Sequence, residues 1–255
     1  MVYNIAVVQC TLSLFGGLAI DSMDQVNTRL LGAKDRALLA YLAIERGRCH
    51  RREVLAGLLW PDYPDHAARA SLRQALHHLR VALGPLSAGL IISATDVAFD
   101  LGAGWRLDVA EFDALLAECA AHVHPARAAC PQCIVRLQQA AGLYTGDLLA
   151  GFSVRDSALF EEWLAPRREH YRREMLAALR DLAEYQERQG ALDLAERTAR
   201  RLLDLDPLDE PAYRQIMRAL FVRGQSAAAL QQYEALRRSL AQELQIAPDD
   251  LTAAL

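Results

Sequence analysis

The sequence contains a single lysine, few aromatic residues and no apolar run long enough to cross a membrane. Lys34 is the only lysine among 28 lysine and arginine residues, and aromatic residues make up 7% of the chain. A membrane-spanning helix needs roughly 18 or more apolar residues in succession, and a secretory signal peptide has its own basic, apolar and small-residue regions. Because the sequence shows neither pattern, we expect a soluble cytoplasmic protein that does not bind membranes.

Regularly spaced cysteines and the motifs of common enzymes are also absent. The chain has five cysteines, and an odd number at irregular spacing argues against the disulfide framework of a small secreted protein. Cys10 and Cys49 are expected to be reduced thiols in the core or at the surface. There is no phosphate-binding loop, nucleophile elbow, paired-carboxylate motif or dinucleotide fingerprint. We therefore expect neither enzymatic activity nor an organic cofactor.

The chain does have abundant apolar residues and an uneven distribution of charge. Apolar residues make up 53% of its 255 residues, enough for one or two domains with sizeable cores. The net charge of −4 conceals a basic segment: residues 29–80 carry ten basic and five acidic residues, whereas residues 108–255 carry 17 basic and 23 acidic residues. This asymmetry indicates a surface for an anionic partner, followed by a module with another role.

One predicted helix, Ala67–Gly84, contains no acidic residue. Four leucines at helical spacing define its buried face: Leu72, Leu76, Leu79 and Leu83. The other side and the flank carry mostly polar residues: Arg69, Ala70, Arg73, Gln74, His77, His78, Arg80 and Val81. Solvated helices usually mix charges of both signs, so cations without carboxylates suit an anionic partner. The helix is a candidate DNA-recognition helix; the alternative is an ordinary arginine-rich surface helix.

The residues around this helix predict a winged-helix domain over residues 1–107. The predicted elements are strands in residues 5–20 with a turn at Gly16-Gly17, helices at Lys34–Glu45, Arg51–Trp60 and Ala67–Gly84, and a hairpin of Leu90–Ser93 and Val97–Leu101. A short turn between the second and third helices is typical of a helix-turn-helix, whose recognition helix enters the major groove. The hairpin would be the wing.

The sequence pattern of residues 108–255 predicts only helices. They are expected at Asp108–Cys119, Ile134–Leu149, Leu159–Gln189 (as one helix or two broken near Pro166), Leu192–Leu203, Glu210–Arg223 and Gln225–Leu244. Gly190 and Gly224 are 34 residues apart, and Ala195 and Ala229 share that offset. A 34-residue helix–turn–helix period is the tetratricopeptide signature and indicates protein–protein contact. The alternative is a generic helical bundle. The fold class is therefore mainly α with small β: a winged helix followed by an all-α, tetratricopeptide-like domain.

With both halves considered, the chain resembles the SARP family of bacterial transcriptional activators. The resemblance covers most of residues 12–250 and rests on KDRALLAYLAIERGRCHRREVLAGLLWPD, AARASLRQALHHLRVALG, LYTGDLLAGFSVRDSALFEEWLAPRRE, RRLLDLDPLDEPAYRQIMRAL and ALQQYEALRRSLAQELQIAPD. It implies an OmpR-type winged-helix DNA-binding domain joined to a bacterial transcriptional activation domain. It further implies binding to promoter DNA, often at direct repeats where two copies could form a homodimer, and recruitment of RNA polymerase.

The resemblance also implies which residues contact DNA. Base contacts are expected from exposed positions of the third helix: Arg69, Ala70, Arg73, Gln74, His77 and His78. Arg80 is expected to face phosphate. Arg51 and Arg52 match backbone-contacting positions at the start of the second helix. One departure is the predicted hairpin tip, Ala94-Thr95-Asp96, which carries no basic residue. That departure leaves open an alternative function, a protein-interaction adaptor whose winged helix no longer binds DNA.

A short histidine- and cysteine-rich segment predicts a structural zinc site. Residues 119–133 read CAAHVHPARAACPQC, which offers two imidazoles and two thiols: His122, His124, Cys130 and Cys133. Cys119 lies one helical turn before His122. Two nitrogens and two thiolates satisfy tetrahedral zinc, and a closed set of four would be structural. The alternative is a polar loop with spare thiols.

Overall fold

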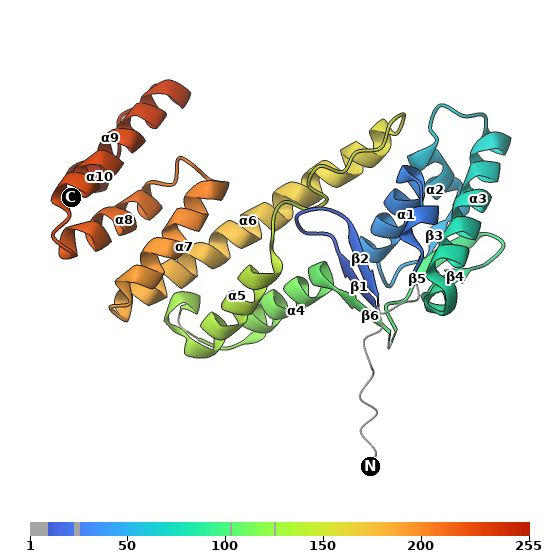
Figure 1. Ribbon diagram of the computed structural model, residues 1–255, viewed down its shortest axis with the longest axis horizontal. Coiled ribbons are helices and arrows are strands. Elements are labelled where there is room, and N and C mark those ends of the chain that lie inside the picture. Colours follow the sequence, from blue (N-terminus) through green and yellow to red (C-terminus); the bar gives the residue numbers. More distant parts are fainter. Residues whose placement is uncertain (1–9, 23–25, 103, 125) are drawn as a thin grey trace, which may run out of the picture. The chain divides into compact units, whose positions relative to one another are not determined.

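The computed structural model describes residues 10–22, 26–102, 104–124 and 126–255. The first five residues of the predicted strand region, 5–9, lie outside them. The chain divides into two compact units. The first comprises the described residues up to Ala114 together with Leu143–Tyr171, and the second comprises Leu115–Gly142 and Arg172–Leu255. Figure 1 labels their helices and strands.

The first unit contains two small sheets of three strands each. The leading sheet has the order β2-β1-β6, from β1 (Cys10–Ser13), β2 (Ala19–Ser22) and β6 (Trp105–Leu107). The wing sheet has the order β3-β5-β4, from β3 (His50–Arg51), β4 (Leu90–Ile92) and β5 (Asp96–Phe99). The two predicted hairpins are β1–β2 and β4–β5. The sequence did not predict β3 or β6, which join these hairpins as third strands.

Three helices lie in sequence between the two hairpins. They are α1 (Ala33–Ile44), α2 (Arg52–Leu59) and α3 (Asp65–Leu83), as the spacing of their apolar residues predicted. Short 3-10 helices at Thr28–Leu30 and Gly84–Gly89 flank this set. Leucines of all three helices are buried, among them Leu38, Leu59 and Leu79, each with no exposed surface. Sheets and helices together form the predicted winged helix.

Residues 143–171 belong to the first unit although they follow helices of the second. The backbone N–H of Leu149 donates to Leu14 O (2.7 Å), and Thr145 Oγ1 donates to Phe15 O (2.7 Å). The Phe15 ring also lies 4.9 Å, centroid to centroid, from the Tyr144 ring. These contacts explain why the predicted helix Ile134–Leu149 is wrong at its end. The observed α5 (Pro131–Leu143) stops where the chain turns to the end of β1.

The regular structure among the described residues of the second unit consists of helices, without strands. Besides α5 it contains the last part of α4 (Asp108–Ala121), the short 3-10 helix Arg127–Ala129, the last part of α6 (Ala158–Arg188), α7 (Leu192–Leu205), α8 (Glu210–Val222), α9 (Ser226–Glu243) and α10 (Asp250–Ala253). Of the two predictions for residues 159–189, one continuous helix is correct, since α6 runs through Pro166. None of the helices searched in the described residues is long and apolar enough to cross a membrane.

The 34-residue repeat is visible in the backbone. Gly190 and Gly224 adopt φ of 71° and 73°, a left-handed conformation that glycine tolerates best, at the ends of α6 and α8. Hydrogen bonds at the two turns match at the same offset: Ala191 N–H to Gln186 O (2.9 Å) and Gln225 N–H to Leu220 O (2.9 Å). This is the pattern of a Schellman C-cap. The repeat therefore reflects two equivalent helix–turn–helix pairs.

Candidate nucleic-acid interface

Helix α3 separates a buried leucine face from an exposed polar face. Leu72, Leu76, Leu79 and Leu83 are each at most 3% exposed. Nine residues of the helix are exposed: Asp65, His66, Arg69, Ala70, Arg73, Gln74, His77, Arg80 and Val81. The helix starts two residues earlier than predicted and therefore contains one carboxylate, Asp65, in its first turn. A carboxylate there complements the helix dipole, and the exposed face beyond it carries no acidic residue of its own.

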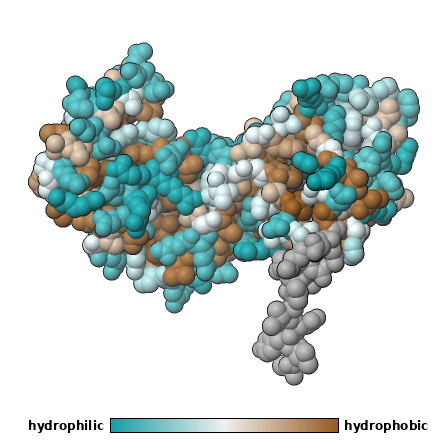
Figure 2. Space-filling view, viewed as in Figure 1, coloured by the Kyte–Doolittle hydropathy of each residue, from teal (hydrophilic) through white to brown (hydrophobic). Residues whose placement is uncertain are grey.

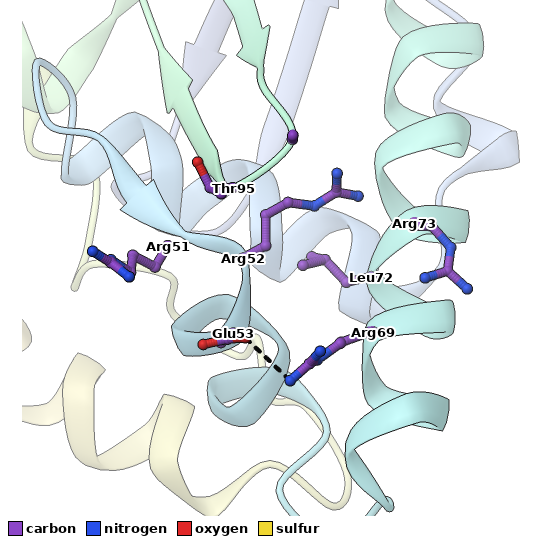
Figure 3. A pocket seen from close by; sticks show the side chains of 8 residues that line it. Arg51, Arg52, Glu53, Arg69, Leu72, Arg73 and Thr95 are labelled. Carbon is purple, nitrogen blue, oxygen red and sulfur yellow. Dashed lines mark ion pairs between the residues drawn. The ribbon is translucent and has the colours of Figure 1, made fainter.

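The start of α2, the middle of α3 and the wing line one surface pocket. Its lining residues are Arg51, Arg52, Glu53, Arg69, Leu72, Arg73, Ala94 and Thr95. Figure 3 shows Arg52 extending toward Arg73 of α3, whereas Arg51 points away from α3. Four arginines thus contribute to the lining of one pocket. Figure 2 shows hydrophilic residues at the edge of the molecule where α3 lies.

Arg52 also fixes the wing against α2. Its backbone N–H donates to Thr95 O (2.9 Å), and its guanidinium donates to Ser93 O (3.3 Å). The turn is closed locally, because the Asp96 N–H donates to Ser93 Oγ (2.8 Å). These bonds place the hairpin tip beside the arginines, but the tip itself offers a carboxylate and hydroxyl groups in place of cations.

Glu53 is a part of this surface that the sequence did not single out. Its carboxylate lies 3.1 Å from the Arg69 guanidinium, in the ion pair drawn in Figure 3. Both side chains are largely exposed, 66% for Glu53 and 52% for Arg69. The pair holds Arg69 toward α2 and places one negative charge among the four arginines. The sequence could not predict this ion pair, because the two residues are 16 positions apart and meet only where α2 contacts α3.

His78 is oriented differently from the other residues of α3 that were predicted to contact DNA. Its Nδ1 lies 3.0 Å from Asp35 Oδ2 of α1, and Asp35 also accepts the N–H of Gly32 at the start of that helix (3.0 Å). Asp35 is 7% exposed and the His78 side chain 37% exposed. His78 therefore connects α3 to α1, and its ring is engaged within the protein. Arg69, Arg73, Gln74 and His77 remain as the exposed set with polar side chains suited to base edges.

The histidine and cysteine residues of the predicted zinc site lie together in the second unit. His122 Nδ1 is 3.4 Å from both Cys130 Sγ and Cys133 Sγ. A ring nitrogen of His122, a ring nitrogen of His124 and Cys133 Sγ all lie within 4.8 Å of one another. Cys119 is adjacent, with its Sγ 3.7 Å from Cys133 O. The structure thus brings all four predicted residues into one cluster. Cys10 is buried and Cys49 is exposed, both as free thiols.

Comparison with known proteins gives the family. Residues 107–255 match the model of the bacterial transcriptional activator domain, which begins next to the predicted boundary at 107/108. The chain is 31% identical over 222 residues to the regulatory protein AfsR of Streptomyces coelicolor, covering 84% of this chain and 20% of AfsR. It is 28% identical over 227 residues to the transcriptional regulatory protein EmbR of Mycobacterium tuberculosis, covering 87% of this chain and 56% of EmbR.

A solved structure has the same fold. Mycobacterium tuberculosis EmbR, in a complex with a low-affinity phosphopeptide, superposes with a TM-score of 0.69 at 24% identity, over 97% of this chain and 63% of that one. The predicted fold class is thereby confirmed. The chain therefore belongs to the family defined by the bacterial transcriptional activator domain, and its resemblance to the SARP regulators is confirmed.

Proposed function

We propose that this chain is a DNA-binding transcriptional activator that acts in the bacterial cytoplasm and binds promoter DNA through α3. The observation that carries the proposal is the exposed face of α3, with arginine and amide side chains over a fully buried leucine face. A helix of this kind, next to a shorter helix and a hairpin, is the arrangement that enters a major groove. The relatives are a regulatory protein and a transcriptional regulatory protein, which supports the same class of function.

Each exposed group has a natural target on a duplex. Gln74 can pair with the N6 and N7 edge of adenine, and Arg69 or Arg73 with the O6 and N7 edge of guanine. Arg51, Arg52 and Arg80 are the candidates for phosphate, which fixes the register of the protein on DNA. His77 and Ala70 complete the exposed face. We leave His78 out of this set, because its ring is bonded to Asp35.

The helical repeats are the proposed protein-contact module. Tetratricopeptide-like pairs bind other proteins through their surfaces and carry no chemistry. We propose that α6–α9 contact RNA polymerase and that two copies bind a direct repeat as a homodimer. We also propose that the chain has neither enzymatic activity nor an organic cofactor. The stoichiometry on a selected site, measured by sedimentation of the protein–DNA complex, tests the dimer: two chains per site are expected.

Selection of bound fragments from a random DNA pool tests the proposal itself. An enriched sequence should bind at least about 10³-fold more tightly than random DNA. Three to five phosphate contacts per chain should give a slope of log K against log salt concentration of about −3 to −4.5. No enrichment, together with a slope near zero, would show that the chain does not recognise DNA.

An adaptor that no longer binds DNA is the alternative function. It is favoured by the wing tip, where Asp96 stands in place of a cation, and by Glu53 in the arginine pocket. An adaptor would show neither salt-dependent DNA binding nor sequence preference, so the same titration separates the two functions.

Replacing Glu53 with glutamine should strengthen DNA binding. The Glu53→Gln variant removes one negative charge beside the phosphates and frees Arg69 from its ion pair. Because exposed ion pairs contribute little energy, we expect a gain in affinity of about 3- to 5-fold at low salt. The salt slope should steepen by about 0.9 if Arg69 then contacts a phosphate. The matched control is Glu243→Gln at the end of α9, which makes the same charge change on the second unit. Equal affinities of Glu53→Gln and the parent chain would place the DNA elsewhere.

A further inference from the structure

We propose that the second unit binds a structural zinc ion through His122, His124, Cys130 and Cys133. The four residues lie between the end of α4 and the first turn of α5: His122 directly follows α4, and Cys133 is the third residue of α5. Both cysteines are buried and both histidines are half-buried. The proposal is independent of DNA binding, because none of these residues belongs to the winged helix.

The distances from His122 to the two sulfur atoms are those of ligands around one tetrahedral ion. Zinc lies about 2.3 Å from thiolate sulfur and about 2.0–2.1 Å from imidazole nitrogen, so a tetrahedral angle sets nitrogen and sulfur about 3.5 Å apart. His122 Nδ1 lies 3.4 Å from Cys130 Sγ and 3.4 Å from Cys133 Sγ. The ligand atom of His124 is within 4.8 Å of those of His122 and Cys133. Cys130 is not in that group of mutually close atoms, so closing the set would require the His124 and Cys130 side chains to move toward the ion.

The two sulfur contacts of His122 Nδ1 cannot both be good hydrogen bonds. A neutral imidazole nitrogen either donates one proton or accepts through one lone pair, so it cannot make two good bonds to two sulfur atoms. His122 Nδ1 nevertheless faces both Cys130 Sγ and Cys133 Sγ at equal distance. A cation between the three atoms would satisfy all of them at once.

His124 shows the orientation expected of a metal ligand. Its Nε2 lies 3.3 Å from Cys119 O, where it can donate a hydrogen bond to that carbonyl. Its Nδ1 is buried and has no hydrogen-bond partner among the residues that the structure describes. Ligating histidines characteristically donate their second ring N–H to a carbonyl or carboxylate, which fixes the tautomer and leaves the other nitrogen for the metal. A cation bound at Nδ1 would account for the missing hydrogen-bond partner of His124.

The donor set specifies the metal and its role. Two thiolates and two neutral imidazoles give a neutral, closed tetrahedral zinc site, whereas magnesium and calcium require oxygen ligands. Four protein ligands leave no open position, so the site would be structural and not catalytic. The ion would join the end of α4 to the start of α5. The same connection is attached to α6 by the ion pair of Arg127 with Asp181.

Metal analysis and cobalt titration of the full chain test the site. Protein purified under a phosphine reductant is expected to contain about one equivalent of zinc. After removal of the metal, Co²⁺ should bind with the visible bands of a tetrahedral site and a near-ultraviolet sulfur-to-cobalt band of two thiolates, and Zn²⁺ should displace it. Less than about a tenth of an equivalent of zinc, with no thiolate band on cobalt addition, would overturn the proposal.

Variants then identify the ligands. Cys130→Ser, Cys133→Ser and His124→Ala should each weaken zinc binding about 100-fold or more, because each removes a ligand. Cys49→Ser and Cys119→Ser should retain it, since Cys49 is exposed in the first unit and Cys119 is oriented toward a backbone carbonyl. Zinc loss in Cys119→Ser with retention in Cys130→Ser would overturn the proposed ligand set. The titration of the unaltered chain decides the presence of the site even if a variant fails to fold.

Discussion

The Arg73→Ala/Gln74→Ala double variant is expected to lose between about 30-fold and 10⁴-fold of its affinity for the selected DNA site. Each bidentate contact between a side chain and a base edge contributes ~1–3 kcal/mol to discrimination, and the variant removes two. Both side chains are exposed on α3, away from its buried leucines. Alanine is also the residue best suited to a helix interior. The fold should therefore be preserved, so the loss would reflect lost contacts with DNA.

The measurement compares specific and random DNA at one salt concentration. The affinity for random DNA should fall much less than the affinity for the site, because only Arg73 can contribute there, through a phosphate. The matched control is Arg238→Ala/Gln242→Ala, which removes the same two residue types from exposed positions of α9. If the Arg73→Ala/Gln74→Ala variant bound the site as tightly as the parent chain, either the face of α3 or the proposed function would be wrong.

Leu76→Ala is expected to destabilise the first unit by roughly 2–5 kcal/mol. Leu76 is 3% exposed on the face of α3 that packs into the core, so truncation removes buried apolar contacts and leaves a cavity. Tryptophan fluorescence reports on this unit alone, because Trp60, Trp105 and Trp163, the only tryptophans of the chain, all lie in it. Denaturant unfolding followed by tryptophan fluorescence measures the decrease in the free energy of unfolding.

A volume-conserving substitution provides the control for this prediction. Leu76→Met keeps the side-chain volume and should cost less than about 1.5 kcal/mol. An alanine variant as stable as the methionine variant would mean that α3 is not anchored through its leucines. The two predictions together test the two faces of α3. Substitutions on the exposed face should lower the affinity for DNA without lowering stability, and substitutions on the leucine face should lower stability.

Local sequence patterns predicted the parts of the fold whose causes are local. The leucine spacing of α3, the β1–β2 and β4–β5 hairpins and the 34-residue repeat all depend on residues close together in the chain. Strands β3 and β6 were missed because two or three residues are too few to show an alternating pattern. The pairing of β1 with β6 joins Cys10 to Trp105, and no local pattern carries that information.

The candidate interface likewise has features that the sequence predicted and features that it could not predict. Periodicity predicted that Arg73 and Gln74 would be exposed, and the structure places them so. The partners of Arg69 and His78 could not be predicted, because Glu53 and Asp35 come from other helices. The His122–Cys133 spacing suggested a metal site, but the 3.4 Å distances and the unpartnered nitrogen of His124 depend on how α4 and α5 meet.

By itself, the sequence determined the family, the order of helices and hairpins, and which side of α3 carries arginine and amide groups. These follow from residue type and spacing, which act within a few turns of helix or strand. Tertiary structure alone decided that residues 143–171 return to the leading sheet, that Glu53 occupies the arginine pocket and that His78 is bonded to Asp35. Such contacts join residues distant in sequence, and packing of the whole unit selects them.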